Sequence, residues 1–123
     1  MIDIQVSLHG QNSSPPLTRS YYFRHESDEK IFLNSVQLVI ERIQKKLKIN
    51  LNEVLTIFLD FLVREYRKKS DADEINDNLS KLLTHDQVLI GVPELVKNIE
   101  FSGIIDTNPA HNQLLESKTE IPT

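Results

Sequence analysis

The chain has 123 residues, of which 39% are hydrophobic and 26% are charged, and its formal net charge is -4 at pH 7. This length suits one domain with a modest core, and the acidic balance argues against a nucleic-acid binder, which needs a basic surplus. Cysteine is absent, which excludes disulfides and thiolate chemistry. We expect a cytoplasmic protein without membrane association, because no apolar run approaches ~20 residues and no secretory signal opens the chain.

The first segment, Ile2 to Leu8, alternates apolar and polar side chains strictly. This alternation predicts a half-buried strand. Glycine, asparagine, serine and two consecutive prolines follow at residues 10–16, which predicts an extended linker. Three aromatic residues at 21–23 indicate that the linker docks on the rest of the protein. Residues 1–26 are therefore predicted to be an N-terminal strand and a linker.

Three helices are predicted next, within a helical domain that covers residues 27–105. The first runs from about Asp28 to Lys46. Asn50 and Glu53 have the spacing of a capping box at the start of the second helix. Apolar residues cover so much of the second helix that it should be the most buried element. A third, shorter helix is capped by residues 70–73, and its buried face consists of Ile75, Leu79, Leu82 and Leu83.

The segment from residue 83 to residue 96 predicts a fourth, short helix. Thr84 and Gln87 have the spacing of a capping box. Gly91 allows the backbone conformation with which helices commonly end. Pro93 presets the backbone for a new first turn.

A brief strand is predicted at residues 99–104, and residues 106–123 are predicted to be a flexible tail because they are polar and lack periodicity. A lone strand leaves backbone amides unpaired. We therefore expect the N-terminal strand to pair with residues 99–104. The predicted fold class is mainly α: a bundle of about four helices with this small β element.

The residues offer no recognisable active site. The four histidines, which lie on different predicted segments and lack metal-site spacing, are His9, His25, His85 and His111. No glycine-rich phosphate loop or nucleophile turn is present, so no catalytic, cofactor-binding or metal residue is assigned. The basic residues at 45–48 and 64–69 match the cation preference of helix C-termini, which explains them without a nucleic acid.

Two stretches resemble the urease gamma subunit family. Residues 83–96 resemble its best-known stretch, which reads leucine-threonine, an acidic pair or acid-amide, valine, a long apolar residue and glycine-valine-proline-glutamate. Residues 47–53 resemble its leucine-lysine-leucine-asparagine motif with a glutamate three residues later. The spacing between the two stretches matches the family without a gap. The resemblance extends over about residues 29–101.

This resemblance implies a urease gamma-like helical bundle that is a non-catalytic structural subunit. The urease complex would hydrolyse urea to ammonia and carbamate, with its nickel site on the large subunit and no cofactor in this chain. The implied partners are the urease large and beta subunits in a trimeric assembly. Six residues would form a possible subunit-contact surface: Thr84, Asp86, Gly91, Val92, Pro93 and Glu94. The same residues could instead only form a capped turn within the chain.

An alternative is a urease gamma-like protein–protein interaction module that is not part of a urease. Two departures from the family pattern favour this alternative. The family's aspartate-glycine hairpin turn is not recognisable after Gly103. Residues 1–22 have no counterpart in the family, and we expect the strand at residues 2–8 to replace the missing hairpin arm beside residues 99–104.

Overall fold

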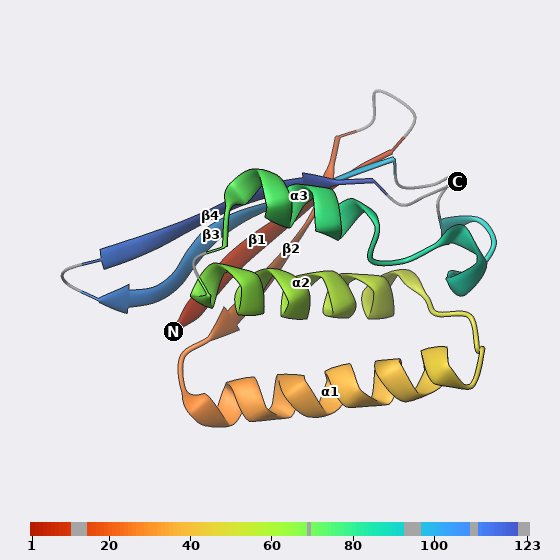
Figure 1. The fold of residues 1–123 in the computed structure, drawn as a ribbon, viewed down its shortest axis with the longest axis horizontal. Helices are drawn as coiled ribbons and strands as arrows, with labels where there is room; N and C mark the ends of the chain where they lie inside the picture. Colours follow the sequence, from red (N-terminus) through yellow and green to blue (C-terminus); the bar gives the residue numbers. More distant parts are fainter. Residues whose placement is uncertain (11–14, 69, 93–96, 109–110, 121–123) are drawn as a thin grey trace.

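The computed structural model describes residues 1–10, 15–68, 70–92, 97–108 and 111–120. The elements in chain order are β1 (Ile2–His9), β2 (Leu17–Phe23), α1 (Glu26–Gln44), α2 (Leu51–Arg67), α3 (Ala72–Ser80), the 3-10 helix η1 (His85–Gln87), β3 (Asn98–Asn108) and β4 (His111–Thr119). The four strands form one antiparallel sheet in the order β2-β1-β3-β4 (Figure 1).

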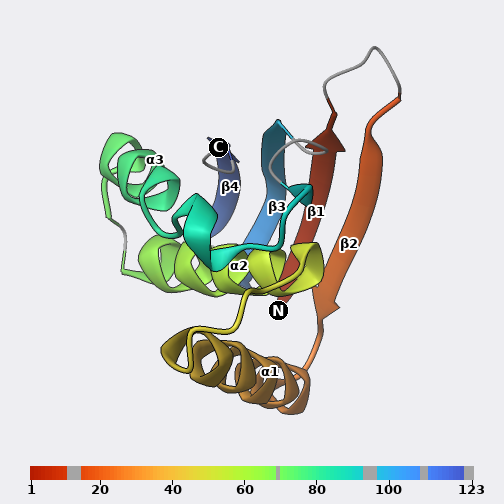
Figure 2. The ribbon, with the colours of Figure 1, turned by 90° about the vertical axis from the view of Figure 1, so that its right-hand side faces the viewer.

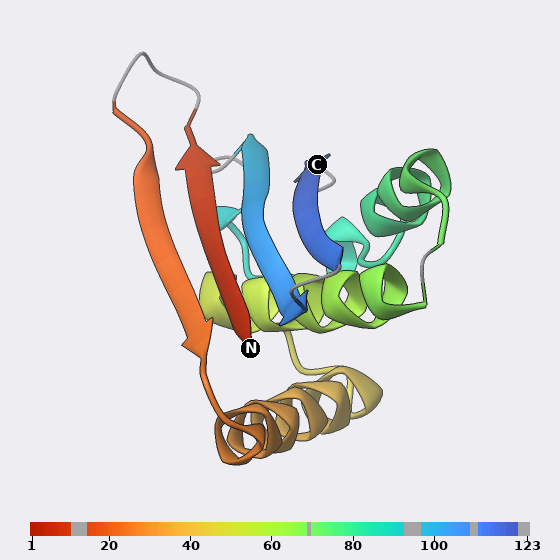
Figure 3. The same ribbon diagram turned by 90° about the vertical axis from the view of Figure 1, so that its left-hand side faces the viewer.

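The prediction of a mainly helical, four-helix bundle is therefore wrong. Within the described residues, the structure has three α-helices, one 3-10 turn and a four-stranded sheet, which makes an α/β fold. Helix α2 crosses one face of the sheet, and α1 lies beyond α2 (Figure 2). No helix among the described elements covers the opposite face, which Figure 3 shows. No helix of the described ranges is long and apolar enough to span a membrane.

Strand β1 lies in the middle of the sheet. It pairs with β3 from Ile2 opposite Ile105 to His9 opposite Asn98, which confirms the predicted pairing of the N-terminal strand with residues 99–104. We also expected β1 to take the place of a missing hairpin arm, and this expectation is wrong. The consecutive strands β3 and β4 pair with each other as well, so that β3 has a partner on each side.

Two strands were not predicted. Most of the β2 side chains are exposed, and this edge strand therefore lacks the alternation that identifies a half-buried strand. Strand β4 occupies half of the segment expected to be a flexible tail, and the end of β3 takes its first three residues. The inward positions of β4 include Ser117 and Thr119, which are buried although they are polar. The hydroxyl of Tyr66 on α2 donates to the backbone carbonyl of Glu116 at 2.9 Å, so a polar contact helps hold this strand.

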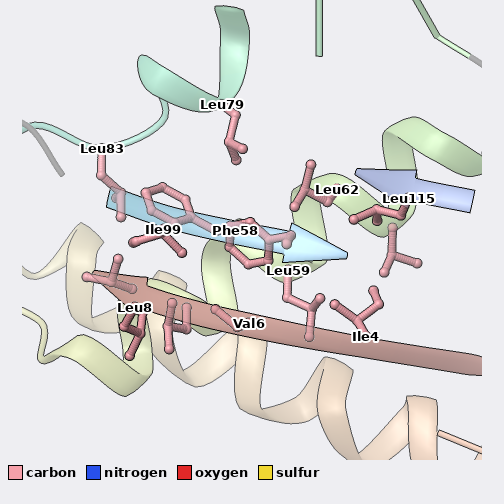
Figure 4. Close-up of a cluster of buried hydrophobic side chains, with 14 of the residues drawn as sticks. Ile4, Val6, Leu8, Phe58, Leu59, Leu62, Leu79, Leu83, Ile99 and Leu115 are labelled. Atoms are coloured by element: carbon pink, nitrogen blue, oxygen red, sulfur yellow. The ribbon is translucent and has the colours of Figure 1, made fainter. Parts of the chain in front are cut away.

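The core lies between the inner face of the sheet and α2. The apolar residues of β1 alternate with exposed ones and are almost completely buried: Ile2, Ile4, Val6 and Leu8. They pack with Phe58, Leu59 and Leu62 of α2 (Figure 4). The rings of Phe58 and Phe101 meet edge to face, with centroids 6.4 Å apart. The prediction that the second helix is the most buried one is confirmed, since six of its residues are buried.

Side-chain caps fix where the helices begin. Helix α1 starts two residues earlier than predicted, because Asp28 Oδ2 accepts the backbone N–H groups of His25 at 3.1 Å and Arg24 at 3.2 Å. The predicted capping box of α2 is confirmed: Asn50 and Glu53 accept each other's backbone N–H at 2.9 and 3.1 Å. On the predicted inner face of the third helical segment, Ile75, Leu79 and Leu83 are buried and Leu82 is half-buried.

Candidate subunit-contact surface

The predicted contact segment is anchored on the loop between α1 and α2. Ile49 and Val88 form a parallel β-bridge. The N–H of Ile49 donates to the carbonyl of Gln87, and the N–H of Leu89 donates to the carbonyl of Ile49, both at 2.9 Å. Both bridge residues are buried. Residues 84–92 are consequently held beside the start of α2 by backbone and core contacts, at one end of the molecule (Figure 1).

The predicted fourth helix is a single 3-10 turn within the described residues. Gln87 Oε1 accepts the backbone N–H of Thr84 at 2.8 Å, which is one half of the predicted capping box. The N–H of Gln87 donates to the backbone carbonyl of Thr84 at 3.1 Å. The turn ends at Val88, whose backbone is extended. The chain stops being helical here because Val88 must reach the bridge with Ile49.

Large apolar side chains are exposed beyond this anchor. Ile90 is 92% exposed and Leu89 is 44% exposed, and Leu47 on the neighbouring loop is 47% exposed. We call these three residues the tip surface. Ile90 is unusual because so large an aliphatic side chain gains nothing from full exposure to water. An anchored backbone that presents apolar side chains to solvent is the arrangement expected of a surface that another protein covers.

The six residues assigned from the sequence fall into three groups. Thr84 and Asp86 are exposed beside η1, and Gly91 and Val92 are half-buried. Gly91 has a φ of +98°, which favours glycine, and its turn directs the chain back after the tip surface. Pro93 and Glu94 lie outside the described residues.

Sequence reasoning missed the residues of the tip surface. Val88, Leu89 and Ile90 form an apolar run, which on its own indicates a buried segment. The run is short and lies directly before a glycine turn, and this feature could have indicated that some of its side chains are exposed. So short a segment has one inward position, which Val88 takes, and its other apolar side chains must face outward.

The histidines lie on separate elements. Nε2 of His9 lies 3.6 Å from a carboxylate oxygen of Glu100 on the sheet, while Nε2 of His85 lies 3.1 Å from Asp86 Oδ1 beside the tip surface. Within the described ranges, no group of three or more histidine, cysteine, aspartate and glutamate residues is placed to hold a metal ion.

An ion-pair cluster centred on Arg67 joins α1, α2 and β3. Its guanidinium donates to Asp106 through Nε at 2.8 Å and Nη2 at 2.9 Å, and Nη2 lies 2.8 Å from Glu29 Oε1. Its hydrogen bond to Asp106 raises the pKa of Arg67, and the same bond lowers the pKa of Asp106 below its ordinary value of 3.8. Asp106 has a φ of +52° and lies beside an irregularity in the β3–β4 register. Its position is therefore fixed both by the backbone conformation and by the ion pair with Arg67.

The Arg67–Asp106 pair gives an expected pH dependence of stability. A lowered carboxyl pKa in the folded state stabilises the fold above pH 3.8, and the contribution is lost as the pH falls through the folded-state pKa. Asp106→Asn should lower the free energy of unfolding by about 1 kcal/mol at pH 7, a value that allows for screening of this half-exposed pair. Asparagine tolerates the positive φ, so the change isolates the charge.

Urea denaturation of both proteins at pH 7 and pH 2 measures this effect. The difference between wild type and Asp106→Asn should be smaller at pH 2 than at pH 7, because below pH 3.8 the unfolded carboxyl is protonated and the lowered pKa of the folded one no longer contributes fully. A difference of equal size at both pH values would show that charge is not the cause.

Comparison with known proteins bears on this surface. A family model described as urease, gamma subunit, matches residues 22–110, a range that includes all three α-helices, the tip surface and β3. The urease subunit gamma of Saccharopolyspora erythraea is 29% identical to this chain over 76 residues, which are 62% of this chain and 76% of that protein. No solved structure matches significantly.

Proposed function

Because this chain belongs to the urease gamma subunit family, we propose that it is a non-catalytic structural subunit of a urease complex. The complex hydrolyses urea to ammonia and carbamate, and its nickel site lies on the large subunit. This chain associates with the urease large and beta subunits in a trimeric, cytoplasmic assembly. Its own contribution is structural, because its α/β fold positions a contact surface for the other subunits.

The observation that carries this proposal is the position of the tip surface. Leu89 and Ile90 belong to the segment that resembles the best-known stretch of the family, and the structure exposes them on a turn fixed by the Ile49–Val88 bridge. A fixed aliphatic side chain loses little conformational freedom on binding, and such residues supply much of the affinity at interfaces. The partner is expected to offer an apolar pocket for Ile90 and polar groups for Thr84 and Asp86.

The alternative is an interaction module of the same family that serves no urease. The absent hairpin no longer favours it, since β3 and β4 pair. Its remaining support is that β1 and most of β2 lie outside the family match although they form half of the sheet. A module of this kind would bind a different protein through the tip surface, so the identity of the partner separates the two functions.

Substitution of Ile90 tests the proposed contact. Co-expression of the tagged chain with the urease large and beta subunits of the same organism should give a complex that survives affinity purification. Ile90→Asp places a charge where an apolar pocket is expected, which should weaken binding by about 2 kcal/mol, or roughly 30-fold. Tyr22→Asp, a change at an exposed residue of β2, is the matched control and should leave the complex intact.

Two outcomes would contradict the proposal. If wild type fails to co-purify with either subunit, the chain does not serve that urease. If the complex forms and Ile90→Asp has no more effect than Tyr22→Asp, the chain is a subunit but the tip surface is not its contact.

A further inference from the structure

Helix α1 has an outward face that the chain itself does not cover. The two buried residues of α1, Val36 and Val39, lie on its inner side. Ile31 and Leu38 are 66% and 62% exposed, and because they are seven residues apart they share one face of the helix. This helix forms the outermost layer of the fold, beyond α2 (Figure 2).

We propose that this face pairs with the same face of a second copy, with the two α1 helices antiparallel. A two-fold axis between residues 34 and 35 places Ile31 of each copy against Leu38 of the other. The residues at the axis are Asn34 and Ser35, which are small enough for two helices to approach closely. The hydroxyl of Ser35 donates to the carbonyl of Ile31 in its own helix at 3.4 Å, so the serine already has a hydrogen-bond partner when it is covered.

The charges on α1 identify a second copy as the partner. Lys30 and Glu41 are exposed and make no ion pair with the described residues. They lie on the same flank of the helix because they are eleven residues, or about three turns, apart. Antiparallel pairing about the proposed axis brings Lys30 of each copy to within about two residues, or roughly 3 Å along the helix, of Glu41 of the other, so that these long side chains can form two equivalent ion pairs.

The ends of the helix select the same orientation. The first turn carries Glu26, Asp28 and Glu29, whereas Arg42 lies in the last turn. Antiparallel pairing opposes the two helix dipoles, while Glu29 and Arg42 keep their ion pairs with Arg67 and Glu53 of the same chain. Parallel pairing would place like charges together. The pairing uses one helix per copy, so it is a small interface and a weak, concentration-dependent association is expected.

Sedimentation equilibrium of the purified chain over a range of concentrations tests the pairing. Wild type should show a reversible monomer–dimer equilibrium. Leu38→Asp should raise the dissociation constant by at least about 30-fold because it puts a charge into the apolar contact. Ile90→Asp, which alters the separate tip surface, should leave the dissociation constant unchanged.

Charge exchange tests that the partner is a second copy in this register. Glu41→Lys and Lys30→Glu should each weaken the dimer roughly three- to tenfold. The double variant, and an equimolar mixture of the two single variants, should restore association. Three results would overturn the proposal. The chain could stay monomeric, the dissociation constant could be unchanged by Leu38→Asp, or the double variant could associate as weakly as the single variants. Because only this chain is present, failure here leaves the proposed urease role intact.

Discussion

Replacing Ile4 with aspartate should abolish stable folding. Ile4 is completely buried in the central strand and faces α2. The substitution removes an apolar side chain and leaves an unpaired carboxylate in the core, a combination expected to cost more than about 4 kcal/mol. Domains of this size are stable by only about 5–15 kcal/mol.

The neighbouring residue gives a matched control. Gln5 is the next residue along β1, and its exposed side chain lies on the opposite face of the sheet. Gln5→Asp should change the free energy of unfolding by less than about 0.5 kcal/mol. Circular dichroism and urea denaturation of both variants measure the difference. Equal stability of the two would mean that β1 is an accessory strand and that the helices are stable without it.

Replacing Gly103 with alanine should have the second-largest effect. A Cβ atom at this position would lie 2.7 Å from Ile4 Cα and would overlap the backbone carbonyl oxygen of Asp3. Both atoms belong to the backbone of β1, so no side chain can rotate to make room. The two strands would have to separate where they pair, and we expect a loss of about 3 kcal/mol.

The adjacent exposed residue, Ser102, provides the comparison. Ser102→Ala adds no atoms and should be nearly neutral in the same urea titration. A Gly103→Ala protein as stable as Ser102→Ala would show that β1 does not approach β3 as closely as the structure has it.

The helices could be predicted because their signals are local. Asn50 with Glu53 is a pattern of side-chain caps that operates over a few residues. The N-terminal strand was also recognisable, since one face of it is buried by α2 and the other is not. Its pairing with β3 followed from the need to satisfy backbone groups.

The rest of the sheet could not be predicted because its signals are not local. Strand β2 lies at the edge, where the core does not impose an apolar alternation. In strand β4, Ser117 is buried and its hydroxyl oxygen lies 3.2 Å from the hydroxyl oxygen of Tyr66. A serine in the sequence does not indicate burial, so this position gave no signal. A fold class inferred from helical periodicity and family resemblance therefore underestimated the strands.

The sequence indicated the candidate contact surface only as a segment. The resemblance directed attention to Thr84, Asp86 and residues 91–94. The exposed side chains Leu89 and Ile90 became evident only when the bridge between Ile49 and Val88 fixed which of the apolar residues faces inward. Which member of an apolar run is buried depends on a neighbour that is distant in sequence.

Native mass spectrometry of urease purified from the organism that encodes this chain tests the central proposal most directly. We predict this chain in the complex, in equal numbers with the large subunit, and loss of both assembly and urease activity when its gene is deleted. An active urease that contains no copy of this chain, or that assembles unchanged after the deletion, would contradict the account.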